Sequence, residues 1–239
     1  MKNIVSLILL VVIFSSCKKN NTTQSPSNNT TPTPTTACSF TAGNGLTDID
    51  GNTYTTVIIG NQEWMAQNLK VSKYRNGISI PTVTDSALWR YSTSGACCYQ
   101  QNLLTNKNIY GMLYNWMVTT NTNNIAPIGW HVPTTAEWNI LINNMGGNTI
   151  AGDKLKEAGT LHWASPSNGN NCSGFNALPG GDRFIGQFKS LNTKGAWWTS
   201  TPNGAGYANV VTMGNSTANV YSNDFYNEED GLYIRLVKD

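Results

Sequence analysis

The stretch Pro133-Thr134-Thr135-Ala136-Glu137-Trp138 carries the clearest structural signal in the chain. Thr134 and Glu137 have the spacing of a capping box, in which a hydroxyl and a carboxylate satisfy unpaired N–H groups at a helix start. Gly146-Gly147 marks the end of the pattern. Between these limits, the apolar residues are spaced so that they lie on one face of a helix: Trp138, Leu141, Ile142 and Met145. The stretch predicts an amphipathic helix from about residue 134 to 145, with its apolar face buried in a core.

Short runs of strand-forming residues lie on both sides of this helix. Before it, strand patterns separated by Asp-Gly and Gly-Asn turn pairs predict a β-meander over residues 46–49, 54–59 and 63–69. After it, strand patterns cover residues 196–201, 208–213, 218–221 and 232–237. Two further helical patterns cover residues 109–118 and 153–158. No internal repeat or second linker interrupts this order, which predicts a single domain of mixed helices and strands.

Composition and charge exclude a nucleic-acid-binding function. Only 12% of the 239 residues are charged, against about 25% in a typical soluble domain. The formal net charge of +2 comes without a cluster of Lys and Arg in the body of the chain. Phosphate-backbone binding depends on such clusters. We therefore expect a polar surface that carries few charges and no nucleic-acid partner.

The amino terminus has the pattern of a bacterial lipoprotein signal. A short basic start is followed by an apolar run over residues 4–14, two serines and Cys17. The run is shorter than the roughly 20 residues that span a membrane. We expect a signal peptide at residues 1–16, and a lipidated Cys17 with a Ser/Thr/Asn/Pro-rich tether at residues 17–37. The folded domain, residues 38–239, is then held at the outer membrane, either at the cell surface or facing the periplasm. An ordinary signal peptide with a coincidental cysteine is the alternative.

Four cysteines remain for the folded domain: Cys38, Cys97, Cys98 and Cys172. An even number in an oxidising compartment predicts up to two disulfides. A bridge between adjacent residues is strained, so we expect one of Cys97 and Cys98 to pair with Cys38 and the other with Cys172. A zinc site is the less favoured alternative, because the chain has no pair of C-x-x-C motifs.

Eight Trp and ten Tyr in a charge-poor chain favour a carbohydrate ligand, since aromatic faces stack on sugar rings. Four tryptophans at apolar positions are assigned to packing: Trp64, Trp116, Trp138 and Trp198. Four aromatic residues in polar segments are candidates for an exposed binding platform: Trp89, Trp163, Tyr207 and Tyr226. Arg183, next to Asp182, is expected either to contact the ligand or to form a buried ion pair that holds its loop.

Four carboxylates lie within seven residues in a predicted loop before the last strand: Asp224, Glu228, Glu229 and Asp230. Oxygen-rich clusters of this kind suit calcium, which takes six to eight oxygen ligands. No glycine-anchored calcium-loop template matches, so a solvated acidic loop is the alternative. The sequence requires no cofactor and leaves calcium as a candidate.

Five motifs in order resemble those of the Fibrobacter major paralogous domain (FISUMP) family: WMAQNL (64–69), YGMLYNW (110–116), GWHVPT (129–134), GFNALPGG (174–181) and WWTST (197–201). The family is similar to the formylglycine-generating enzyme and sulfatase-modifying factor superfamily. The resemblance implies an α+β fold of the C-type lectin-like kind, with few helices, twisted antiparallel sheets and long ordered loops. The enzymes of that superfamily use a pair of cysteines late in their domain to hold copper, and residues 173–239 contain no cysteine.

We therefore expect a protein that is not an enzyme. The G-x-S-x-G, H-E-x-x-H and G-x-x-x-x-G-K-[ST] motifs are absent, and His131 is expected to be a hydrogen-bonded structural residue. The first hypothesis is a lipid-anchored binding or adhesion module of the outer membrane, with a glycan or a surface protein as its partner. The alternative is a structural or accessory subunit of a larger surface complex, and an oxidase is the third and least favoured function.

Overall fold

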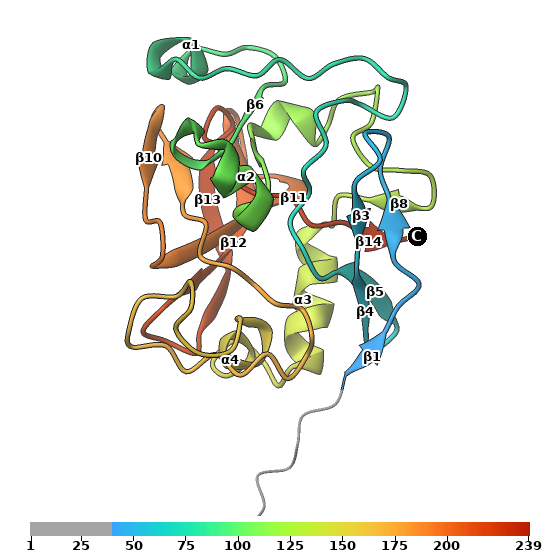
Figure 1. Cartoon of the computed structure of the whole chain (residues 1–239), viewed down its shortest axis with the longest axis vertical. Coiled ribbons are helices and arrows are strands. Elements are labelled where there is room, and N and C mark those ends of the chain that lie inside the picture. Colours follow the sequence, from blue (N-terminus) through green and yellow to red (C-terminus); the bar gives the residue numbers. More distant parts are fainter. Residues whose placement is uncertain (1–39) are drawn as a thin grey trace, which may run out of the picture. The chain divides into compact units, whose positions relative to one another are not determined.

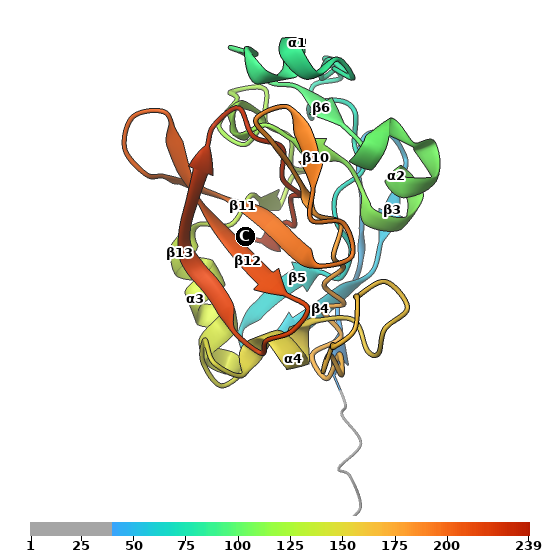
Figure 2. The ribbon, with the colours of Figure 1, turned by 90° about the vertical axis from the view of Figure 1, so that its left-hand side faces the viewer.

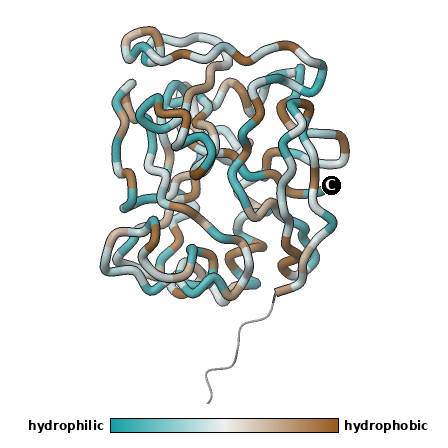
Figure 3. The backbone as a smooth tube through the Cα atoms, viewed as in Figure 1, coloured by the Kyte–Doolittle hydropathy of each residue, from teal (hydrophilic) through white to brown (hydrophobic). Residues whose placement is uncertain are grey.

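The computed structural model describes residues 40–239, which belong to one compact unit. The predictions on the signal peptide, the lipidated Cys17, the tether and Cys38 lie outside these described residues. Along residues 40–239, no helix has the length and apolar character needed to cross a membrane. Hydrophobic and hydrophilic stretches alternate along this part of the chain (Figure 3).

Two sheets form the framework, and all paired strands in them are antiparallel. The five-stranded sheet has the order β1 (Thr41–Ala42), β4 (Thr56–Ile59), β5 (Gln62–Met65), β14 (Val237–Lys238), β8 (Trp130–His131). The three-stranded sheet has the order β11 (Lys194–Pro202), β12 (Tyr207–Gly214), β13 (Val220–Asn227). Three two-stranded ribbons complete the strands: β2 (Leu46–Thr47) with β3 (Thr53–Tyr54), β6 (Cys97–Cys98) with β7 (Leu113–Tyr114), and β9 (Asp182–Phe184) with β10 (Gln187–Lys189).

The helices are few and short. The α-helices are α1 (Ser86–Arg90), α2 (Leu104–Tyr110), α3 (Thr135–Asn144) and α4 (Ala151–Leu155), and the 3-10 helices are η1 (Gln100–Asn102) and η2 (Trp116–Val118). The predicted α+β class is confirmed. The lectin-like topology within that class stays a prediction.

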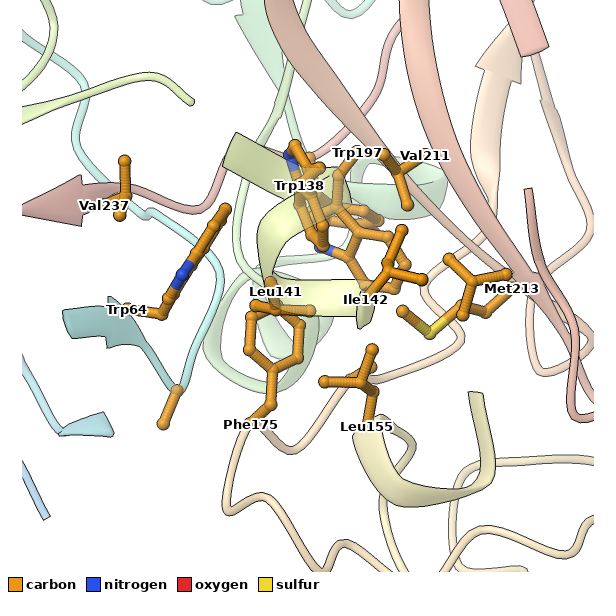
Figure 4. Packing of buried hydrophobic residues seen from close by; sticks show 14 of the residues in the cluster. Trp64, Trp138, Leu141, Ile142, Leu155, Phe175, Trp197, Val211, Met213 and Val237 are labelled. Atoms are coloured by element: carbon orange, nitrogen blue, oxygen red, sulfur yellow. The ribbon is translucent and has the colours of Figure 1, made fainter. Parts of the chain in front are cut away.

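α3 lies between the two sheets (Figure 1) and connects their cores. Its predicted capping box is present: the Thr134 hydroxyl accepts from the Glu137 N–H, and the Glu137 carboxylate accepts from the Thr134 N–H at 2.8 Å. The buried face of the helix consists of Trp138, Leu141 and Ile142. The Trp138 ring lies 4.8 Å from that of Trp64 on β5 and 6.1 Å from that of Trp197 on β11 (Figure 4). The four tryptophans that were assigned to packing are all buried.

The prediction of a helix over residues 109–118 is wrong. α2 ends at Tyr110, because Gly111 has a φ of +88° and its backbone lies so close to Asn68 that an added Cβ would come within 2.8 Å of the Asn68 Cβ. The chain then pairs Leu113 and Tyr114 with Cys98 and Cys97. The helical spacing of the apolar residues there reflects burial on several sides of an irregular segment.

The cysteine-pairing prediction is also wrong. Among residues 40–239, Cys97 and Cys98 are free and buried. As neighbours on one strand they point to opposite faces, and each enters a different core cluster. Burial raises the pKa of Cys97 to about 11 and that of Cys98 to about 12. Cys172 is not a free thiol.

Four segments that are distant in the chain meet at a buried polar cluster, the Asn68–Arg235 hub. The Asn68 side-chain oxygen accepts from Trp197 Nε1 at 2.8 Å and from Arg235 Nε at 2.9 Å. The Arg235 guanidinium also donates to the Phe175 and Asn176 carbonyls and lies 4.1 Å from the Phe175 ring. Burial lowers the pKa of Arg235 to about 9. These residues therefore hold distant segments of the fold together through buried hydrogen bonds.

Candidate functional site

A depression lies between α1 and the β9–β10 hairpin, and we call it the α1 groove. It consists of two hollows of about 380 and 600 Å³. Both are lined by Arg90, Tyr91 and Ile185. Volumes of this size are typical of small-molecule sites. The groove is therefore large enough for a ligand and open to solvent along its length.

Arg183 fixes the two walls of the groove from beneath. Its guanidinium donates to the carbonyls of Val83, Thr84 and Asp85 at 2.7–3.0 Å, and its Nε donates to the Gly186 carbonyl at 3.0 Å. The cation lies 4.5 Å from the Trp89 ring and 4.9 Å from the Phe188 ring. Arg183 is 1% exposed, so its guanidinium is shielded from water. One buried side chain thus joins α1 and its preceding loop to the hairpin.

Asp230 holds the crest of the hairpin in an unusual backbone conformation. Its carboxylate accepts from the Ile185 N–H at 2.8 Å and from the Asn227 side-chain amide at 3.3 Å. Ile185 has a φ of +49°, which is strained for a β-branched residue. Burial raises the pKa of Asp230 to about 6. Ile185 therefore lines both hollows in a backbone conformation that a β-branched residue disfavours.

The surface of the groove combines exposed rings with planar polar groups. Tyr91 is 72% exposed and Phe184 is 40% exposed. Around them, the groove is lined by the side chains of Arg90, Gln187, Asn227 and Glu229. Flat aromatic faces beside amides, carboxylates and a guanidinium match the alternating apolar faces and hydroxyl rims of sugar rings.

Three of the predicted ligand-contacting residues are buried, which corrects the expectation of an exposed platform. Trp89 lies in the core beneath Arg183 and Trp163 beneath Lys156, whose Nζ is 5.6 Å from the Trp163 ring. Arg183 is committed to backbone carbonyls and does not pair with Asp182, which instead contacts Lys194 at 3.0 Å. A polar sequence neighbourhood did not keep these side chains at the surface, because the segments that carry them turn these side chains into the core.

The two predicted tyrosines lie at the surface of the three-stranded sheet. Tyr207 is exposed and packs edge-to-face on exposed Phe225, with ring centres 5.5 Å apart. Tyr226 is half-buried, packs edge-to-face on Phe184 and donates to the Asp182 carboxylate at 3.1 Å. Tyr226 thus supports one wall of the α1 groove, although it does not line it.

The four predicted calcium ligands do not converge. Asp224 belongs to β13 and accepts from the Thr212 hydroxyl at 2.9 Å, which corrects the prediction that it lies in a loop. Asp230 is turned into the protein toward Ile185. Within residues 40–239, no group of three or more His, Cys, Asp or Glu side chains is placed to hold a metal ion. Of the four carboxylates, Glu229 and Asp230 line the α1 groove.

His131 is hydrogen-bonded between two carboxylates, as expected for a structural histidine. Its Nδ1 lies 2.6 Å from the Asp239 carboxylate and its Nε2 lies 2.7 Å from that of Glu137. Burial opposes protonation, but the hydrogen bonds of Asp239 and Glu137 outweigh it and raise the pKa of His131. The imidazole thereby ties β8 and the start of α3 to the end of β14.

Sequence reasoning missed the two exposed aromatic rings of the groove, Tyr91 and Phe184. A signal for α1 was present, because Asp85 caps it by accepting from the N–H groups of Ala87 and Leu88. The proximity of α1 to the β9–β10 hairpin had no local signal, since about a hundred residues separate the two elements along the chain.

The chain belongs to the Fibrobacter succinogenes major domain family, whose pattern matches residues 57–238. The match contains the α1 groove and the Asn68–Arg235 hub. No curated protein and no solved structure matches the chain. The membership confirms the resemblance in the five motifs, and it specifies neither a ligand nor a reaction.

Proposed function

We propose that this protein is a non-enzymatic, lipid-anchored binding module of the outer membrane and that a glycan binds in its α1 groove. The observation that carries the proposal is the Tyr91 ring, 72% exposed on the wall of a groove lined by Gln187, Asn227 and Glu229. An exposed ring of this size beside groups that can bond hydroxyls supports stacking on a sugar.

The two buried charged residues of the groove support binding over catalysis. The oxygens of Asp230 accept from Ile185 and Asn227, and its side chain is almost completely shielded, at 2% exposure. Arg183 donates to four backbone carbonyls. Both groups therefore hold the walls in place, which supports a binding role.

The alternative is that the same groove takes a protein partner in a surface complex. Leu88 on the outer side of α1 is 69% exposed, and exposed apolar groups near a groove are typical of protein-binding surfaces. A glycan-binding signal that depends on Tyr91 supports the first proposal. A stoichiometric partner whose binding depends on Tyr91 and Leu88, without any glycan signal, supports the second.

The test is a glycan array probed with the wild-type protein, Tyr91→Ala and the control Ile128→Ala. Ile128 is 85% exposed and lines none of the groove. Removing an aromatic group at the centre of a binding site costs at least about 1–2 kcal/mol, so Tyr91→Ala is expected to weaken binding about tenfold or more. Equal signals from all three proteins would contradict the proposal. Labelling with radioactive palmitate, lost in Cys17→Ser, tests the lipid anchor separately.

A further inference from the structure

Four hollows on the described surface share lining residues or have lining residues that are neighbours in the chain, and they extend beyond the α1 groove. Lys189 lines the larger hollow of the groove, and the adjacent Ser190 lines another hollow on the face of the three-stranded sheet. That sheet-face hollow, about 460 Å³, shares Tyr221 and Asp224 with a fourth hollow of about 280 Å³ at the edge strand β13. In Figure 2, β10 lies between α1 and the β11–β12–β13 sheet. We call this series the track.

Tyr226 contacts residues of both halves of the track, which are the α1 groove and the pair of hollows on the three-stranded sheet. Its ring packs on Phe184, which lines the α1 groove, with ring centres 5.9 Å apart. Its hydroxyl contacts the Lys194 ammonium, which lines the sheet-face hollow. Asp182 accepts from Lys194 at 3.0 Å and from Tyr226 at 3.1 Å. The two halves therefore share one rigid support.

A β-bulge in β13 puts the second exposed ring on the track. Tyr221 is opposite Thr212 and Asp224 is opposite Val210, so three steps on β13 correspond to two steps on β12. In a regular strand, residues three apart point to opposite faces. The bulge instead brings both Tyr221 and Asp224 to the face of Thr212, which donates to Asp224 at 2.9 Å. Tyr221 is 47% exposed there.

The chemistry of the second half of the track suits an uncharged, hydroxyl-rich ligand. Beyond Lys194 and Asp224, its polar lining consists of hydroxyl and amide side chains such as Ser190, Thr193, Asn215 and Asn223. Along the whole track, the basic residues Arg90, Lys189 and Lys194 are balanced by the acidic residues Asp85, Glu229 and Asp224 among the solvent-accessible groups. A surface without a dominant charge does not select a polyanion.

We propose that the track binds an extended, uncharged polysaccharide chain, with Tyr91 and Tyr221 as separate stacking sites for different sugar units. The proposal rests on glycan binding in the α1 groove and adds that the ligand is a polymer. Two stacking sites on one rigid surface make the second contact intramolecular, so the affinity of a long chain exceeds that of a short one without further ordering of the protein. We expect a disaccharide to contact one stacking site only, because none of the four hollows is lined by both tyrosines.

The experiment measures the affinity of the full-length protein in detergent for uncharged oligosaccharides of two to eight units from the cello, xylo and manno series. In the series that binds, we expect affinity to rise at least about tenfold between the shortest and longest members. Tyr221→Ala should remove that gain and leave the affinity for the disaccharide unchanged. Tyr91→Ala should weaken binding of both. Tyr221→Phe, which keeps the ring, should retain the gain and shows that loss of stacking is the cause.

Three outcomes would overturn the proposal. Affinity that depends on Tyr91 but does not change with chain length would leave glycan binding in the groove and remove the track. Equal weakening of short and long chains by Tyr221→Ala, with an unchanged thermal midpoint, would make Tyr221 part of a single compact site. Absence of binding to every uncharged series, together with binding to polygalacturonate, would assign the track to a charged ligand. Glycan binding that is unaffected by Tyr91→Ala would instead contradict the proposed function itself.

Discussion

Replacing Asn68 by alanine should destabilise the fold strongly, because one amide satisfies three buried groups. Its oxygen accepts from Trp197 Nε1 at 2.8 Å and Arg235 Nε at 2.9 Å, and its nitrogen donates to the Tyr110 carbonyl at 2.7 Å. Each buried polar group left without a partner costs about 1–3 kcal/mol. Arg235 keeps its bonds to three backbone carbonyls. We therefore expect Asn68→Ala to lower the free energy of unfolding by about 4 kcal/mol.

The assay is thermal unfolding followed by near-ultraviolet circular dichroism, which reports the packing of the tryptophans around Asn68. For a domain of this size, 1 kcal/mol corresponds to about 2–4 °C, so the midpoint should fall by about 8–16 °C. Asn108→Ala is the matched control, because Asn108 is exposed on α2, and it should change the midpoint by less than about 2 °C. Asn68→Asp keeps both acceptor roles beside the Arg235 cation but sets a carboxylate oxygen against the Tyr110 carbonyl, so it should recover only part of the loss. If Asn68→Ala unfolds at the same temperature as Asn108→Ala, the assignment of the hub as a structural centre is refuted.

Three further predictions concern pH, cysteines and calcium. The pKa of His131 in the folded state is raised above the unfolded value of about 6.5. The stabilisation of the fold by the protonated imidazole is therefore complete below that pH and is lost as pH rises through the folded pKa. The thermal midpoint of the wild type should thus fall more between pH 5.5 and pH 9 than that of His131→Gln, and parallel curves would exclude the effect. The Phe40 ring lies against Gly174, where an added Cβ would come within 2.6 Å of it. Because these two residues are close in sequence to Cys38 and Cys172, peptide mass spectrometry under non-reducing conditions should find Cys38 linked to Cys172 and both thiols of β6 free. A disulfide to either β6 cysteine would contradict this prediction. Millimolar calcium should leave the thermal midpoint unchanged, because the carboxylates from Asp224 to Asp230 do not converge, and a clear rise would restore the calcium hypothesis.

Local patterns predicted those elements whose determinants are close in sequence. The capping box and apolar spacing of residues 134–145 specify α3 almost to its limits, because cap, periodicity and end signal all lie within one helix. β11 and β12 were also predicted close to their bounds. β13 is longer than its pattern, because its second half, from Asn223 to Asn227, is stabilised by pairing with β12 and carries exposed side chains that have no apolar alternation.

The family motifs show which part of the structure could be predicted from the sequence. Five short segments identified the family, and the structure places four of their residues at the Asn68–Arg235 hub. The motifs therefore report the folding of the domain. Tyr91, Phe184 and Tyr221 lie outside the five motifs, so the signal that found the family could not find the groove.

By itself the sequence determined the family, the α+β class, the principal helix and the core positions of Trp64, Trp116, Trp138 and Trp198, since each depends on local spacing or on apolar burial. Which of the other aromatic residues are exposed was decided by the tertiary structure alone. Trp89 is buried because Arg183, almost a hundred residues away, stacks on it and ties its helix to the hairpin. Tyr221 is exposed beside Asp224 because the register of β13 on β12 slips by one residue. Both results depend on contacts between segments distant in the chain, and the residue types at these positions are compatible with either environment.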